Sequence, residues 1–77
     1  MKEFTVTYFF DAQHYVKRFV HETSEKQVEA LIKSERDQYI SFTDRRGVYH
    51  ELHTRNVRYI QMTEYHRDDK SDVSLST

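Results

Sequence analysis

Apolar and polar residues alternate along most of the chain, with the period of two that is typical of half-buried β-strands. The first such segment, residues 3–10, divides into two sets that would face opposite sides of a strand: Phe4, Val6, Tyr8 and Phe10 against Thr5, Thr7 and Phe9. A second segment at 14–21 follows a short interruption at 11–13. Aromatic and β-branched residues are frequent in both segments, so we expect a two-stranded hairpin.

The segment 24–35 is different, because its apolar residues recur at helical spacing. Its apolar side chains share one face of a helix, opposite a charged face: Val28, Leu31 and Ile32. Ser24 and Gln27 have the spacing of a capping box, in which the serine hydroxyl bonds to the first turn. A short isolated helix is not stable in water, so we expect this helix to lie on a sheet.

The length of the first turn decides which side chains of the second strand join the Phe4 face. A three-residue loop pairs Phe10 with His14 and adds one set to that face: Val16, Arg18 and Val20. A four-residue loop pairs Phe10 with Tyr15 and adds the other set: Tyr15, Lys17 and Phe19. The turn contains no glycine, so we favour the four-residue loop. Either register leaves apolar groups beside Phe9 on the opposite face.

The chain after the helix predicts a second hairpin. A strand at 39–43 ends at the turn 44–47, where Gly47 can adopt a positive φ as the last residue of a three-residue loop with a bulge. This register matches apolar side chains across the hairpin, in the pairs Phe42 with His50 and Ile40 with Leu52. A short irregular or helical link at 53–56 and a final strand at 57–65 complete the pattern.

These elements predict an α+β fold with the order β-β-α-β-β-β. We expect a mainly antiparallel five-stranded sheet with the helix at 24–35 on one face; the alternative is a small, strongly bent barrel. The side chains expected under the helix come from the last three strands: Ile40, Phe42, Leu52, Ile60 and Met62. Residues 1–65 form one small domain in this interpretation, and the polar segment 66–77 is expected to be disordered.

Amino-acid composition limits the cellular location that we expect for the protein. The 77 residues contain no cysteine, one glycine and no proline, and the formal net charge is −1. No stretch approaches the roughly 20 apolar residues of a membrane span, and no N-terminal segment resembles a signal peptide. We therefore expect a cytoplasmic protein without a membrane partner. Six tyrosines and five phenylalanines are a heavy aromatic load, available for the core or for a contact surface.

The C-terminal half carries a resemblance to other proteins. The segment I-S-F-T-D-R-R-G-V-Y-H-E-L-H-T-R-N-V-R-Y-I-Q-M, residues 40–62, is similar to the closing hairpin of small uncharacterised proteins from Gram-positive bacteria and their phages. It covers about a third of the chain and contains no diagnostic motif. The resemblance implies a bacterial or phage setting and no particular chemistry.

The sequence offers little support for catalysis or metal binding. His50 and His53 are three residues apart on an expected strand, so they point to opposite faces, whereas a zinc site needs three or four converging ligands. No serine lies in a nucleophile motif such as G-x-S-x-G. We expect no enzyme activity, no metal, no cofactor and no small-molecule substrate.

The sheet face opposite the helix is the expected binding surface, because large contiguous apolar patches are rare on monomers. The leading hypothesis is a non-enzymatic module that self-associates or docks on a partner protein through this face. Tyrosine is common in such interfaces because it combines apolar area with a hydroxyl group. The predicted partner-binding residues are Phe9, Tyr39, Tyr49 and Tyr59, with Arg45 and Arg58 at the rim.

Two other functions remain open. Residues 44–58 contain four arginines against two carboxylates, a net charge of +2, and tyrosines lie nearby. This combination is typical of single-stranded RNA or DNA binding, where cations contact phosphates and rings stack on bases. The residues predicted for that role are Arg45, Arg46, Arg55, Arg58, Tyr49 and Tyr59. A third hypothesis is a phage-type effector that binds and inhibits a host protein.

Overall fold

The computed structural model describes residues 1–65 and confirms the predicted α+β fold and element order. The elements are β1 (Lys2–Phe9), β2 (Tyr15–Glu22), α1 (Glu25–Ser34), β3 (Tyr39–Thr43), β4 (Tyr49–His53), the 3₁₀ helix η1 (Thr54–Asn56) and β5 (Tyr59–Tyr65). The predicted disordered segment, 66–77, lies outside the described residues.

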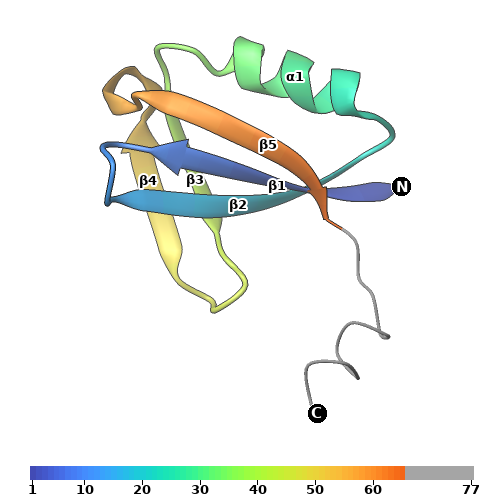
Figure 1. Cartoon of the computed structure of the whole chain (residues 1–77), viewed down its shortest axis with the longest axis horizontal. Coiled ribbons are helices and arrows are strands. Elements are labelled where there is room, and N and C mark those ends of the chain that lie inside the picture. The colour runs from blue at the N-terminus through green and yellow to red at the C-terminus, as the bar shows by residue number, and fades with distance from the viewer. Residues whose placement is uncertain (66–77) are drawn as a thin grey trace.

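The five antiparallel strands are divided between two sheets, which do not close into a barrel. One sheet has the order β2-β1-β5, and the other is the β3–β4 hairpin. Figure 1 shows the hairpin crossing the three-stranded sheet at a steep angle, with α1 running alongside β5. The chain returns from the hairpin through η1, and the backbone N–H of Arg58 donates to the Phe9 carbonyl at 2.7 Å where β5 begins.

The core lies between one face of the β2-β1-β5 sheet and the elements that cover it. Its buried apolar side chains come from four elements: Phe4, Val6, Tyr8, Val20, Val28 and Ile40. The side chains expected beneath the helix pack against this core as partly buried neighbours, apart from the buried Ile40. The β3–β4 hairpin and α1 therefore cover this face of the sheet together. Phe42 of β3 stacks on Tyr8 of β1, with ring centroids 5.9 Å apart.

The favoured register of the first hairpin was wrong. Phe4 pairs with Val20 and Phe9 with Tyr15, which is the register of the three-residue loop. The aspartate at the start of the loop replaces the glycine that the turn lacks: Asp11 Oδ1 accepts hydrogen bonds from the backbone N–H groups of Gln13 at 2.7 Å and His14 at 2.8 Å. The set Tyr15, Lys17 and Phe19 therefore lies on the Phe9 face.

The second hairpin has the predicted register. Ile40 pairs with Leu52 and Phe42 with His50. Gly47 has a φ of +84°, and its N–H donates to the Asp44 carbonyl at 3.0 Å. No other heavy atom lies within 4 Å of the position that a Cβ on Gly47 would occupy, so its backbone conformation, and not a lack of space, makes glycine suitable here.

The helix begins where the pattern predicts, but its cap differs. Ser24 is the N-cap residue, yet its side chain makes no capping hydrogen bond, so the predicted capping box is not formed. The backbone alone starts the helix, with the N–H of Gln27 donating to the Ser24 carbonyl at 3.2 Å. Val28 is completely buried, which shows that tertiary packing of the apolar face holds the helix in place.

Candidate functional site

The outer face of the β2-β1-β5 sheet points away from α1 and the β3–β4 hairpin. Side chains alternate along each strand, so the residues between the core positions occupy this face. Its central residues come from all three strands: Thr5, Thr7, Phe9, Tyr15, Lys17, Phe19, Tyr59, Gln61 and Thr63. Neither α1 nor the hairpin body covers them, because both pack on the opposite face.

Three rings gather at one end of the outer face, one from each strand, and we call Phe9, Tyr15 and Tyr59 the ring cluster. The Phe9 and Tyr59 rings stack with centroids 4.3 Å apart and an interplanar angle of 5°. Tyr15 lies on the other side of Phe9 at 5.4 Å. Half of each tyrosine remains exposed, 52% for Tyr15 and 50% for Tyr59. The cluster is thus internally ordered but open to a partner.

The opposite end of the outer face is closed by the tip of the β3–β4 hairpin. The Arg45 guanidinium forms an ion pair with Glu3 and lies over the rings of Phe19, at 4.1 Å, and Tyr65, at 4.7 Å. Arg45 was predicted as a rim residue for a partner or for nucleic acid. In the structure, the ion pair of Arg45 with Glu3 holds the hairpin tip against the sheet.

A polar strip joins the two ends. Thr5, Thr7, Gln61 and Thr63 lie between the ring cluster and Arg45, and they line a shallow hollow together with Lys17. The Lys17 ammonium lies 6.0 Å from the Tyr15 ring centroid. The carboxylate on this face, Glu3, is paired with Arg45 and with His21. Thr7 is buried in the middle of the strip, so the strip presents the hydroxyl groups of Thr5 and Thr63, the Gln61 amide and one cation, Lys17, that makes no ion pair among the described residues.

Tyr39 and Tyr49 do not lie with Phe9 and Tyr59. They occupy the solvent side of the hairpin, where they are 75% and 62% exposed, and Tyr39 contacts the His53 ring edge-on at 4.5 Å. The expected single aromatic surface is therefore two surfaces on two sheets. Sequence reasoning assumed one continuous sheet, so it placed on one face rings that the structure separates.

The remaining predicted arginines are dispersed. Arg46 pairs with Asp44 at the hairpin tip, at 3.3 Å, and Arg55 pairs loosely with Asp37 at 3.6 Å. Arg58 precedes Tyr59 of the ring cluster and makes no ion pair in the part of the chain that the structure describes. Of the cations predicted to bind nucleic acid, only Arg58 thus has no ion pair among the described residues, and it lines the space between α1 and β5, not the hollow of the outer face.

A polar triad lies beneath the sheet and was missed from the sequence. The Arg18 guanidinium donates through one nitrogen to the Tyr8 hydroxyl at 3.1 Å and to a Glu35 carboxylate oxygen at 2.8 Å. Burial raises the pKa of the Tyr8 hydroxyl. The signal was present, because the three-residue register places Arg18 on the core face, where an arginine needs a partner.

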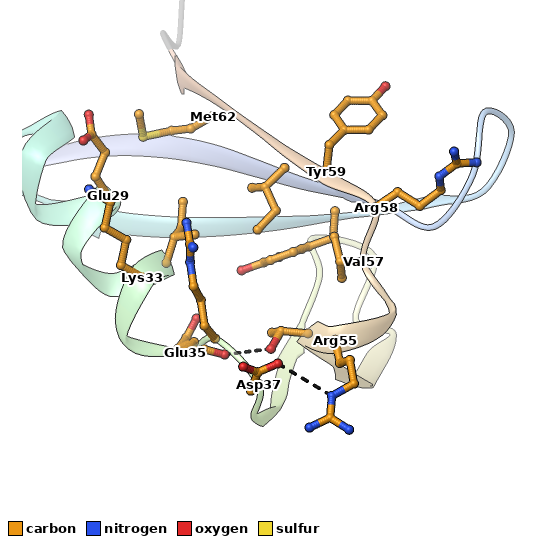
Figure 2. Close-up of a pocket in the computed structure, with 14 residues that line it drawn as sticks. Glu29, Lys33, Glu35, Asp37, Arg55, Val57, Arg58, Tyr59 and Met62 are labelled. Atoms are coloured by element: carbon orange, nitrogen blue, oxygen red, sulfur yellow. Dashed lines mark hydrogen bonds and ion pairs between the residues drawn. The ribbon is translucent and has the colours of Figure 1, made fainter.

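A groove separates α1 from β5 and ends at η1. Figure 2 shows Glu29, Lys33 and Glu35 on its helix side and Met62 reaching toward the helix from β5. Its apolar lining consists of Ile32, Val57, Ile60 and Met62, with Tyr8 at the base, and its cavity volume is about 750 Å³. This is within the size range of small-ligand and peptide sites.

The histidines of β4 diverge, as the strand pattern predicts. His50 faces inward and its Nε2 lies 2.8 Å from Asp44, whereas the His53 Nδ1 accepts a hydrogen bond from the Arg55 N–H at 3.0 Å. Within residues 1–65, no three histidine or carboxylate side chains are placed to hold a metal ion. The described part of the chain also has no helix long and apolar enough to cross a membrane.

The comparisons with protein-family models, with curated proteins and with solved structures found no match to this chain. The geometry of the outer face and of the groove is therefore the basis for the function proposed below.

Proposed function

We propose that the protein is a binding module without catalytic activity, which associates with a second copy of itself through the outer face. The observation that carries this proposal is the ring cluster, in which two half-exposed tyrosines flank Phe9 at the end of the outer face that neither α1 nor the hairpin covers. Aromatic clusters of this kind are enriched at protein interfaces, where each ring contributes large apolar area.

A second copy is the simplest partner for this face. The polar strip carries hydroxyl and amide groups that can donate and accept, so two such strips are complementary to each other. The face spans three strands of seven or eight residues. At about 3.3 Å per residue and about 4.8 Å between strands, it measures roughly 26 by 14 Å, which is less than half of the roughly 800 Å² per partner of a standard interface, so we expect a weak, transient association.

Sedimentation over a concentration series tests self-association. We expect the apparent mass to rise toward that of a dimer, and Tyr15→Ser to weaken the association at least tenfold. Tyr39→Ser is the matched control, because it removes an exposed tyrosine from the other sheet and should leave the association unchanged. A monomer throughout the series, or equal loss from both variants, would reject the proposal.

Single-stranded nucleic acid is the second candidate, favoured by two cations that make no ion pair among the described residues. Lys17 lies by Tyr15 on the outer face, and Arg58 lines the groove that Tyr59 also borders, while Glu3 is neutralised by its own partners. Rings that stack on bases and cations that contact phosphates are the two requirements of such sites. On this hypothesis, nucleic acid would bind at the ring cluster, away from Tyr49 and Arg46.

Fluorescence anisotropy with labelled oligouridine and oligothymidine separates the two candidates. If the outer face binds nucleic acid, affinity falls steeply with salt, and Lys17→Ala with Arg58→Ala reduces the salt slope by about 1 each. Arg46→Ala, at the hairpin tip, is the control. The absence of binding at low salt would eliminate this candidate and leave self-association unaffected.

A further inference from the structure

The strand that borders the groove has an unpaired edge. In the described part of the chain β5 pairs with no strand other than β1, so between Tyr59 and Thr63 its other edge presents N–H and C=O groups that no second strand pairs. Such an edge is a template for pairing with another chain. No proline interrupts β5, and Figure 1 shows α1 running beside this edge, where it flanks the strand.

The groove next to this edge has the apolar lining that an added strand requires. Ile60 and Met62 are two residues apart on β5 and both face the groove, with Ile32 of α1 opposite. All three are partly buried against the core, so the lining is fixed by the fold. Side chains of a strand paired to β5 would enter the groove at every second position, which matches this spacing.

The charges around the groove are unevenly neutralised. The Glu35 carboxylate is held by Arg18 at 2.8 Å, and Asp37 lies 3.6 Å from Arg55. Lys33 and Arg36, from the end of α1, line the groove and make no ion pair among the described residues. The remaining acid of the lining, Glu29, lies one helical turn before Lys33 on α1, as Figure 2 shows. A further cation of the lining, Arg58, also makes no ion pair among the described residues. The groups without an ion pair are thus three cations and one acid, so a ligand carboxylate is favoured near Lys33 and Arg36.

We propose that the groove binds an extended acidic peptide, which adds to the free edge of β5 as a further strand. Apolar side chains at alternate positions would pack on Ile60 and Met62, and a carboxylate would meet Lys33 and Arg36. Main-chain hydrogen bonds to β5 supply affinity, and the groove and the cations supply specificity. Tyr59 borders this groove as well as the ring cluster, but Phe9, Tyr15 and the polar strip are not part of the groove, and the proposal does not depend on the proposed self-association.

NMR titration of the full chain with acetyl-Val-Thr-Val-Thr-Glu-amide tests the proposal, because the two valines and the glutamate share one face of an extended strand. We expect amide shifts along β5 and at least tenfold tighter binding than with the peptide in which lysine replaces the glutamate. A central proline in place of valine should abolish the β5 shifts, because it removes a main-chain donor. Lys33→Glu with Arg36→Glu should reverse the preference for acid. The control is the double variant Lys26→Glu with Arg46→Glu, which changes the net charge by the same amount at two positions outside the groove. It should keep the preference for the acidic peptide.

Several results would overturn the proposal. The absence of β5 shifts at millimolar peptide would exclude strand addition. If decanoate displaces the peptide, and the peptide itself causes no shifts in β5, the groove binds an anionic amphiphile and not an added strand. The chain's own residues 72–75 also contain two alternate apolar residues, Val73 and Leu75, and an acid, Asp72. If the double variant Val73→Asp with Leu75→Asp binds the peptide tenfold more tightly than the wild type, the segment 72–75 is the natural occupant of the groove. Tyr15→Ser should change self-association and leave peptide binding intact, which distinguishes the two sites.

Discussion

Two aspartates close the two hairpins by the same means. The carboxylate of each accepts hydrogen bonds from two backbone N–H groups of its own turn and from a histidine ring. Asp11 has His14 Nδ1 at 2.8 Å, and Asp44 has His50 Nε2 at 2.8 Å. The hydrogen bonds from Gln13 and then from His14 lower the pKa of Asp11, and the bond from His50 is the largest cause of the low pKa of Asp44.

The low pKa of Asp44 predicts a loss of stability in acid. The folded-state pKa lies below the ordinary value of 3.8, so the contribution to stability is complete above that pH and is lost as the pH falls below it. Asp44→Asn keeps the Oδ1 acceptor for the turn and removes the charge. We expect its urea midpoint to be below that of the wild type at about pH 6, with the difference shrinking toward about pH 2.

The exposed carboxylate of Asp37 supplies the control for this measurement. Asp37 has a φ of 56°, which asparagine also tolerates, and its side chain is 72% exposed. Asp37→Asn should therefore have the wild-type profile from about pH 6 to about pH 2. A difference between Asp44→Asn and wild type that stays constant with pH would contradict the assigned role of the Asp44 charge.

The Arg18 pair predicts strong coupling between two residues. Arg18 and Glu35 side chains are 16% and 17% exposed, so removing one leaves the other poorly solvated. We expect Arg18→Met and Glu35→Met to cost about 2 kcal/mol each, and the double variant to cost less than their sum. Urea denaturation of the four proteins in this cycle gives the coupling energy. Additive costs would show that the pair is not coupled.

At the scale of elements, Phe42 attaches the β3–β4 hairpin to the three-stranded sheet. Its ring stacks on Tyr8 and lies 5.6 Å from the Arg18 guanidinium. The hairpin tip is held separately, where Arg45 meets Glu3. The hairpin is thus fixed at its middle and its tip, although no backbone hydrogen bond ladder joins it to the β2-β1-β5 sheet.

Truncation of Phe42 should therefore destabilise the whole fold. The ring is partly buried, so we expect Phe42→Ala to cost about 2 to 3 kcal/mol, at the low end for a buried phenylalanine. Tyr49→Ala is the matched control, since it removes a ring that is 62% exposed on the same hairpin, and should cost less than about 0.5 kcal/mol. Equal costs in chemical denaturation would contradict the packing role of Phe42.

The elements could be predicted from sequence because their signals are local. Periodicity located the helix and the five strands, and Gly47 fixed the second turn. The first turn was misjudged because Asp11 replaced the expected glycine through its side chain. The division into two sheets could not be predicted, because it depends on pairing β5 with the distant β1. The predicted site was divided for the same reason, with Tyr39 separated from Phe9.

At the scale of the molecule, a small core is combined with two uncovered surfaces. Six apolar side chains are buried in the described residues. The ring cluster lies on the outer face, and the groove lies between α1 and the free edge of β5. A partner on either surface would add to stability by mass action, which matters most for a protein with so little interior.

The most direct test of self-association through the outer face is a dilution series followed by NMR on the full, unmodified chain. The account predicts concentration-dependent amide shifts at Phe9, Tyr15 and Tyr59, with little change at Tyr39 and Tyr49. Spectra that are identical at every concentration, or shifts confined to the tyrosines of the β3–β4 hairpin, would contradict it.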